Sequence, residues 1–89
     1  MLTKEFLLEH GFKWREFEDN SRNNHSGEFE LYKAPSYIVT VYWFEGEEGN
    51  EWNINILSIE HNREVKIRAN ENFPLTEFTD ALKVCKIIL

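Results

Sequence analysis

Hydrophobic and polar residues follow two different periods along this chain, and the change of period separates two expected helices from a central sheet. The first helical segment carries an apolar run at residues 6–8, and we expect a helix over about residues 4–10. Thr3 can cap its start by accepting a backbone N–H bond. Gly11 can adopt the left-handed conformation that closes a helix C-terminus, so both ends of this short helix are marked.

The end of the chain carries the clearest helical pattern. Its apolar residues have the i, i+3, i+4, i+7 spacing of one buried face: Phe78, Ala81, Leu82 and Cys85. Helical backbone is disfavoured for the residue before Pro74, and Thr76 is the candidate N-cap. We therefore expect a second helix that begins close to Thr76 and runs toward the C-terminus.

Between the helices the period falls to two, as in strands with one buried face. The expected strands are residues 13–18, which is the weakest of them, 28–32, 37–44, 52–56 and 64–68. The expected links are a polar loop over 19–27, a turn at 34–36, a loop over 45–50 and a turn at 61–62. Short links make sequential strands antiparallel neighbours. The pattern predicts one α+β domain over residues 1–89, with a single antiparallel sheet of four to five strands bracketed by an N-terminal and a C-terminal helix packed on one face.

The two helices can cover only one face of such a sheet, which divides the strand residues into two sets. The most apolar choice for the helix-covered face is Phe29, Leu31, Val39, Val41, Trp43, Trp52, Ile54, Ile56, Val65 and Ile67. We expect Phe6, Leu7, Phe78, Leu82 and Cys85 to pack on it. The opposite face is not uniformly polar. In antiparallel sheets with one solvent-exposed face, hydrophobic and polar residues usually alternate regularly along each strand.

That second face carries five apolar or aromatic residues among its polar ones: Tyr32, Ile38, Tyr42, Phe44 and Leu57. Contiguous exposed apolar patches usually mark interaction sites, and Tyr and Phe are enriched at the centres of protein interfaces. These five residues are therefore the candidate partner-binding residues. The alternative is that residues 13–18, with Trp14 or Phe17, fold across this face and bury it.

The composition favours a protein that folds without covalent cross-links in a reducing compartment. Of the 89 residues, 42% are hydrophobic and 15% aromatic, and the single cysteine excludes an intramolecular disulfide. The first residues lack the basic and apolar regions of a signal peptide. No apolar run approaches the roughly 18 residues of a membrane span. We expect a cytoplasmic protein with no membrane partner.

The net charge of −6 bears on the partner class. Residues 1–59 hold eleven acidic and five basic residues, whereas residues 60–89 hold five of each. The acidic part cannot offer the continuous positive surface that phosphate backbones require, so direct nucleic-acid binding is disfavoured. Residues 45–51 pack four carboxylates into seven positions. Such a loop is more typical of a solvated hairpin tip than of a calcium site, but it could also imitate phosphates.

The residues with reactive side chains form no recognisable catalytic pattern. His10, His25 and His61 share no ligand spacing with each other or with Cys85, which lies on the apolar face of a helix. Nucleophilic-elbow, phosphate-loop and dinucleotide motifs are absent from the sequence. We expect no enzyme activity, no cofactor and no metal. The first hypothesis is a protein-binding module whose partner is another protein or a second copy. The alternative is an acidic inhibitor of a nucleic-acid-processing enzyme.

Both ends of the chain carry a family resemblance. Leu2-Thr3 with Phe6-Leu7 and Gly11-Phe12 at the start, and Leu75, Ala81-Leu82 and Cys85 at the close, resemble small uncharacterised proteins of bacterial and prophage genomes. Those proteins have similar length and the same helix-sheet-helix order. The resemblance implies the fold and a bacterial or phage cytoplasmic setting, and it carries over no site residues because its matching positions are core and cap residues.

Overall fold

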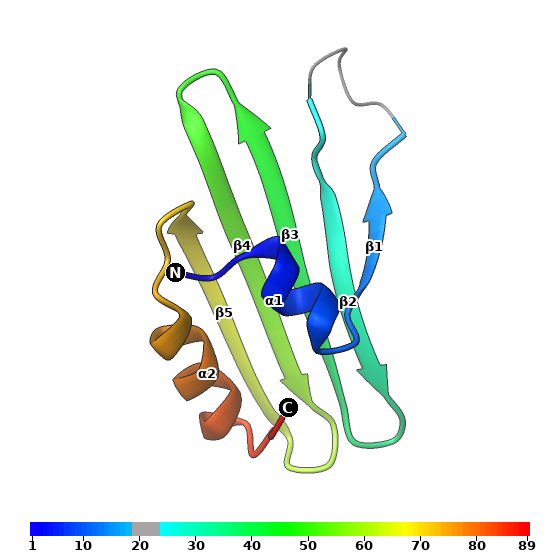
Figure 1. Ribbon diagram of the computed structural model, residues 1–89. Coiled ribbons are helices and arrows are strands. Elements are labelled where there is room, and N and C mark those ends of the chain that lie inside the picture. The colour runs from blue at the N-terminus through cyan, green and yellow to red at the C-terminus, as the bar shows by residue number, and fades with distance from the viewer. Residues whose placement is uncertain (19–23) are drawn as a thin grey trace.

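A five-stranded sheet and two helices make up the computed structural model, which describes residues 1–18 and 24–89 (Figure 1). The elements in chain order are α1 (Lys4–Glu9), β1 (Lys13–Glu16), β2 (Gly27–Lys33), β3 (Tyr37–Gly46), β4 (Gly49–Ser58), β5 (Arg63–Asn70) and α2 (Leu75–Val84). Of the polar loop expected over residues 19–27, residues 19–23 lie outside the described residues.

The strands form an antiparallel meander in the order β1-β2-β3-β4-β5, so each strand pairs with its neighbours in sequence. The expected single antiparallel sheet of an α+β domain is confirmed. The longest hairpin runs from the pair Tyr37–Ser58 to the pair Gly46–Gly49. Both strands continue through the loop expected over 45–50, because Gly49 has a φ of +129° and allows the chain to reverse in a tight turn.

Helix α1 has both of the end signals expected for it. The side chain of Thr3 accepts a hydrogen bond from the Phe6 N–H at 3.1 Å. Gly11 has a φ of +87°, and the Phe12 N–H donates to the Leu7 carbonyl at 3.0 Å. These bonds satisfy groups that a helix end otherwise leaves without partners.

The expected N-cap of α2 is wrong. The helix begins at Leu75 with Pro74 in the cap position, and Thr76 lies inside the helix. The reason is that the Pro74 carbonyl already accepts from the N–H groups of Glu77 and Phe78, at 3.1 and 3.2 Å. Helical bonding therefore starts before Thr76 and needs no side-chain cap.

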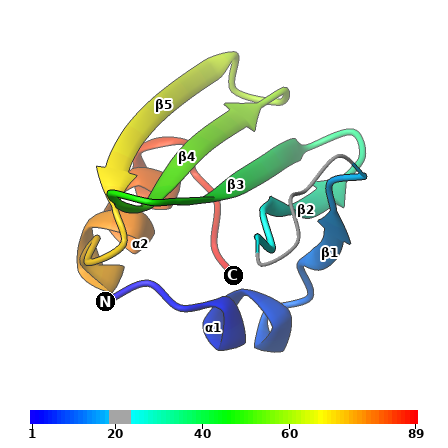
Figure 2. The same ribbon diagram turned by 90° about the horizontal axis from the view of Figure 1, so that it is seen from above.

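Both helices lie on the same side of the sheet, as Figure 2 shows. The hydrophobic core fills the space between the helices and the sheet. The residues expected on the helix-covered face all belong to this core or pack against it. Four further core residues come from segments that flank the helices: Leu2, Phe12, Phe73 and Ile87. The Leu2 N–H donates to the Phe73 carbonyl at 2.7 Å, so the N-terminal segment is tied to the start of α2.

The pairing of β1 fixes the position of Lys13–Glu16, the first part of the segment 13–18. Lys13–Glu16 pairs with β2 at the edge of the sheet and so does not cross either face. The ring of Trp14 packs on the helix side with its centroid 4.6 Å from that of Phe29. Gly27 makes this possible, since a Cβ there would lie 2.5 Å from the Trp14 ring. Trp14 therefore belongs to the core and does not cover the second face.

The described residues include no helix with the length and apolar character needed to cross a membrane.

Candidate interaction face

The face of the sheet turned away from both helices is covered by no other described element (Figure 2). We call it the bare face. Strand alternation and the pairing register assign its side chains to Lys13, Arg15, Glu28, Glu30, Tyr32, Ile38, Thr40, Tyr42, Phe44, Glu51, Asn53, Asn55, Leu57, Glu64, Lys66, Arg68 and Asn70. All five candidate partner-binding residues are among them.

The register brings the five candidate residues together in two groups rather than one. Tyr32 stands opposite Ile38, which in turn stands opposite Leu57, so these three form a row across β2, β3 and β4. Tyr42 and Phe44 lie toward the other end of β3, with stacked rings 6.2 Å apart. The row that contains Thr40 separates the two groups.

Exposure differs among these residues. Tyr32 is 58% exposed and Phe44 is 36% exposed. Ile38, Tyr42 and Leu57 are partly buried by their neighbours in the sheet. The large rings of Tyr32 and Phe44 therefore remain available to a partner, and Ile38, Tyr42 and Leu57 add half-buried apolar surface beside them.

Phe17 joins the second group and was not among the candidate residues. Its ring centroid lies 6.4 Å from that of Tyr42 and 5.9 Å from that of Phe44. The Phe17 N–H donates to the Ser26 carbonyl at 3.0 Å, which holds the residue at the sheet edge. Trp14 and Phe17 are separated by an odd number of positions, and this spacing was the signal that places them on opposite faces. We call Phe17, Tyr42 and Phe44 the aromatic cluster.

Charged residues flank the aromatic cluster on both sides as ion pairs. Arg15 pairs with Glu28 on the β1 side. Arg68 Nε donates to Glu51 Oε2 at 3.1 Å on the β5 side, where Lys66 also lies 3.6 Å from Glu64. The bare face has equal numbers of basic and acidic side chains: Lys13, Arg15, Lys66 and Arg68 against Glu28, Glu30, Glu51 and Glu64. It therefore has no net charge, although the whole chain carries −6.

A shallow hollow of about 350 Å³ lies beside Tyr42 on the same face. Its lining comes from β3, β4 and β5: Tyr42, Asn53, Ile54, Asn55, Lys66, Ile67 and Arg68. The Oδ1 atom of Asn55 is buried and has no hydrogen-bond partner among the described residues. The bare face thus combines protruding rings with a neighbouring polar hollow.

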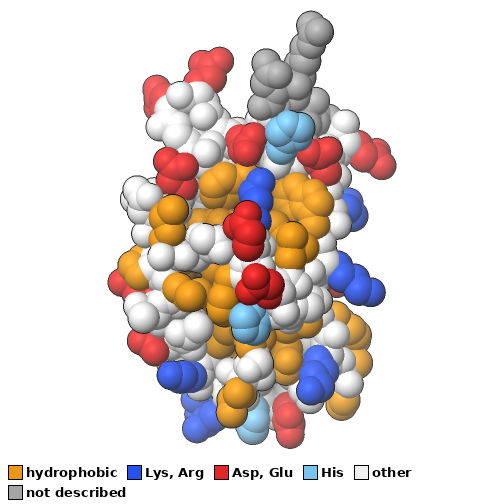
Figure 3. Space-filling model, viewed as in Figure 1, with side chains coloured by type: hydrophobic (Ala, Val, Ile, Leu, Met, Phe, Trp, Pro, Cys, Tyr) orange, Lys and Arg blue, Asp and Glu red, His pale blue; other side chains and the backbone are white. Residues whose placement is uncertain are grey.

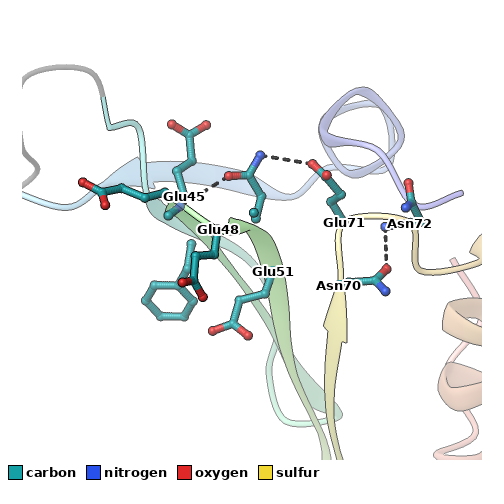
Figure 4. Close-up of a pocket in the computed structure, with 11 residues that line it drawn as sticks. Glu45, Glu48, Glu51, Asn70, Glu71 and Asn72 are labelled. Atoms are coloured by element: carbon teal, nitrogen blue, oxygen red, sulfur yellow. Dashed lines mark hydrogen bonds between the residues drawn. The ribbon is translucent and has the colours of Figure 1, made fainter.

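A second concave region, of about 850 Å³, lies at the turn between β3 and β4 (Figure 4). Five glutamates line it: Glu45, Glu47, Glu48, Glu51 and Glu71. The labelled carboxylates in Figure 4 do not converge on one point, and Asn50 Nδ2 donates to Glu71 Oε2 at 3.1 Å. No group of three or more His, Cys, Asp or Glu residues in the described part of the chain is placed to hold a metal ion.

Glu45 is held by hydrogen bonds from two other segments of the chain. Its carboxylate accepts the His25 N–H at 2.8 Å and the Trp43 Nε1–H at 3.1 Å, and the ammonium group of Lys4 is nearby. The hydrogen bond from His25 and then that from Trp43 lower the pKa of Glu45 below its ordinary value. Glu45 therefore has a structural role in joining β3 to the segment before β2.

The helix side of the molecule shows hydrophobic side chains among charged ones (Figure 3). Lys4 Nζ lies 5.3 Å from the Trp14 ring and 5.1 Å from the Trp43 ring, so a cation caps these indoles. Leu8, Val84 and Ile88 are exposed on the helices and the C-terminal segment. A small hollow of about 370 Å³ lies between the helices and includes Phe6 and His10 in its lining.

The remaining reactive side chains belong to different segments of the chain. His10 Nδ1 is 2.8 Å from the Phe6 carbonyl oxygen, and His25 Nδ1 is 2.8 Å from Glu16 Oε1. His61 lies exposed in the turn after β4. Cys85 is fully buried, and this burial raises the pKa of its thiol, which lowers its reactivity.

Comparison with protein-family models, with curated proteins and with solved structures finds no match to this chain.

Proposed function

We propose that this chain is a non-catalytic protein–protein interaction module of the bacterial or phage cytoplasm that binds its partner through the bare face. The observation that carries the proposal is the exposure of large rings, Tyr32 and Phe44 above all, on a sheet face that no other described element covers. Burying such rings against a partner removes apolar area from water, which is the main favourable contribution to most protein association.

The surroundings of the rings support the same function. Tyr, Phe and Arg are enriched at interfaces, and a polar rim normally surrounds the buried centre. Here Arg15 and Arg68 lie on opposite sides of the aromatic cluster, each already paired with a glutamate. A partner can cover the cluster without leaving either guanidinium buried and unpaired.

Site-specific photo-cross-linking tests this function. A photoreactive phenylalanine analogue replaces Tyr42 in one variant and Thr76, which is exposed on α2, in the control. Expressed in the source cells and irradiated, the variant at position 42 should give discrete cross-linked protein products that the control lacks. Equal or absent cross-linking from the two positions would show that the bare face binds no protein.

The second candidate function is inhibition of a nucleic-acid-processing enzyme by charge mimicry. The observation in its favour is that five glutamates line one concave end of the sheet. Three of them are engaged within the protein, since Glu45 accepts bonds from His25 and Trp43, Glu51 pairs with Arg68, and Glu71 accepts a bond from Asn50. The charge available to an enzyme therefore comes mainly from the exposed residues Glu47 and Glu48 at the turn.

Charge reversal at the turn separates the two candidates. Nuclease activity in an extract of the source cells toward added duplex DNA is measured with the protein and with its Glu47→Lys/Glu48→Lys variant. Mimicry predicts inhibition by the protein and its loss in the variant, with an unchanged circular dichroism spectrum. An uninhibited extract contradicts mimicry and leaves the interaction proposal intact.

A further inference from the structure

We propose that the occupant of the bare face is a second copy of this chain, packed sheet against sheet about a two-fold axis. This inference rests on the proposed function, because it names the partner for the same face. Three properties of the face argue for a second copy: its charge balance, its size and the self-complementary arrangement of its apolar residues.

The charge balance removes the obstacle that faces any self-association of an acidic chain. Two molecules of charge −6 repel each other on approach. The bare face has four basic and four acidic side chains at its strand positions, so it is neutral. The excess negative charge lies on other surfaces. Two copies can therefore meet through the bare face without bringing an excess of negative charge together.

The size of the face is suited to a stable dimer. Five strands spaced about 4.8 Å apart, with several same-face residues along each strand at about 7 Å intervals, give a flat area of roughly 25 by 25 Å. Side-chain relief raises the accessible area above this flat value. The total approaches the ~800 Å² that each partner contributes to a standard stable interface.

The arrangement of apolar residues meets the requirement of a two-fold interface, in which the same patch contacts itself. The aromatic cluster lies toward one end of the face, and the row of Tyr32, Ile38 and Leu57 lies toward the other. A two-fold axis across the strands turns one end of each copy over the opposite end of the other, so the aromatic cluster of each copy lies over that row of its partner. Both contacts form at the same time and bury apolar side chains against apolar side chains.

The charge along the strands selects one of the two possible orientations. The turn between β3 and β4 carries Glu47 and Glu48, and the opposite end of the molecule carries more basic than acidic residues: Lys33, Arg63, Lys83 and Lys86 against Glu60 and Glu64. On the helix side, Figure 3 shows most of the red side chains toward the upper end, with others at the centre and the lower end, and blue side chains from the middle to the lower end. A two-fold axis across the strands places the acidic end of each copy over the basic end of the other, whereas an axis along the strands brings like charges together. The proposed dimer has the first arrangement.

Sedimentation equilibrium on the purified full chain tests the dimer. The expected mass is twice the 10.7 kDa of one chain for the unchanged protein and for the control Ile88→Asp, which places the same charge at an exposed apolar residue on the helix side. Tyr42→Asp is expected to sediment as a monomer with an unchanged circular dichroism spectrum. A monomeric unchanged protein, or an Ile88→Asp variant as dissociated as Tyr42→Asp, overturns the proposal.

Cysteine cross-linking keeps the test decisive if Tyr42→Asp does not fold. Thr40→Cys lies near the middle of the bare face, Thr76→Cys on α2 is the matched control, and the native Cys85 is fully buried. Packed sheets are about 10 Å apart, which is too far for a direct disulfide, so a bismaleimide of that reach is used. A covalent dimer from Thr40→Cys alone supports the packing, and equal yields from both variants overturn it.

Two further variants test the orientation. Glu48→Cys and Lys33→Cys, mixed and treated with the same reagent, should give more of the cross-linked pair than either variant alone. Cross-linking of Glu48→Cys mainly to itself overturns the arrangement with opposite ends together. A monomer by sedimentation that still gives discrete photo-cross-links from position 42 to another protein overturns the dimer and retains the proposed function, whereas the absence of both refutes the two together.

Discussion

The ring of Phe17 lies 5.9 Å from the ring of Phe44, although the whole of β2 separates the two residues in sequence. The contact spans the edge of the bare face, because Phe17 follows β1 and Phe44 belongs to β3. Phe17 thus enlarges the aromatic cluster while leaving its outer side open. The cluster is therefore the part of the bare face where a single truncation should affect association more than folding.

Phe17→Ala should weaken dimerisation about 2- to 10-fold, which corresponds to the 0.5–1.5 kcal/mol of an aromatic pair. The free energy of unfolding should fall by only about 1 kcal/mol because Phe17 is partly exposed. Sedimentation equilibrium measures dimerisation. Urea denaturation, at a protein concentration low enough for the chain to be monomeric, measures the free energy of unfolding. Leu8→Ala, at an exposed residue of α1, is the control and should leave dimerisation unchanged. Equal weakening by both variants would contradict a specific role for the cluster.

The two threonines at the helix starts should respond differently to alanine. Thr3→Ala removes the side-chain acceptor of the Phe6 N–H and should lower the free energy of unfolding by about 1 kcal/mol. Thr76→Ala should change it by less than about 0.5 kcal/mol, because the Thr76 side chain makes no capping bond in α2. Urea denaturation followed by tryptophan fluorescence measures both variants. A Thr76→Ala loss as large as that of Thr3→Ala would show that the start of α2 is wrongly placed.

These threonines also show how far the sequence determined the fold. Local patterns gave the helices, the strands and the helix-covered face, because periodicity reports which side of an element is buried. Local patterns did not predict the cap of α2, because a backbone carbonyl such as that of Pro74 can accept the first helical bonds without any side-chain signal. Core residues outside the helices and strands, such as Leu2 and Ile87, were not predicted because periodicity reports burial only within a regular element.

The sequence predicted which residues lie on the candidate face, but it did not predict how these residues group on that face. Alternation assigned Tyr32, Tyr42 and Phe44 to one face, but the division into two groups depends on the pairing register. The place of Trp14 depended on Gly27, whose missing side chain admits the indole on the helix side. Such a long-range steric relationship leaves no periodic trace in the sequence.

Gly27→Ala should destabilise the protein by about 2–3 kcal/mol. The added Cβ would lie 2.5 Å from both the Trp14 ring and the Arg15 carbonyl oxygen, so β1 must shift away from β2. Lys33→Ala, at the exposed far end of the same strand, is the control and should change the free energy of unfolding by less than about 0.5 kcal/mol. Urea denaturation of both variants tests this. A tolerated Gly27→Ala would place Trp14 outside the core.

The stability contributed by Glu45 should depend on pH. Because hydrogen bonds from His25 and Trp43 lower the pKa of Glu45 in the folded protein, its ionised form stabilises the fold. This contribution is present above the ordinary pKa of 4.5 and is lost as the pH falls through the lowered folded pKa. Glu45→Gln should therefore be less stable than the unchanged protein at pH 7, and the difference should shrink below pH 4.5.

Urea denaturation of both proteins across this pH range measures the difference. Glu47→Gln is the matched control, because it removes the same charge from the exposed turn next to Glu45 and reports the effect of net charge alone. Tryptophan emission, to which Trp43 contributes with an indole N–H that donates to Glu45, is followed over the same pH range. If Glu45→Gln and Glu47→Gln have the same stability profile against pH, the two hydrogen bonds to Glu45 do not stabilise the fold.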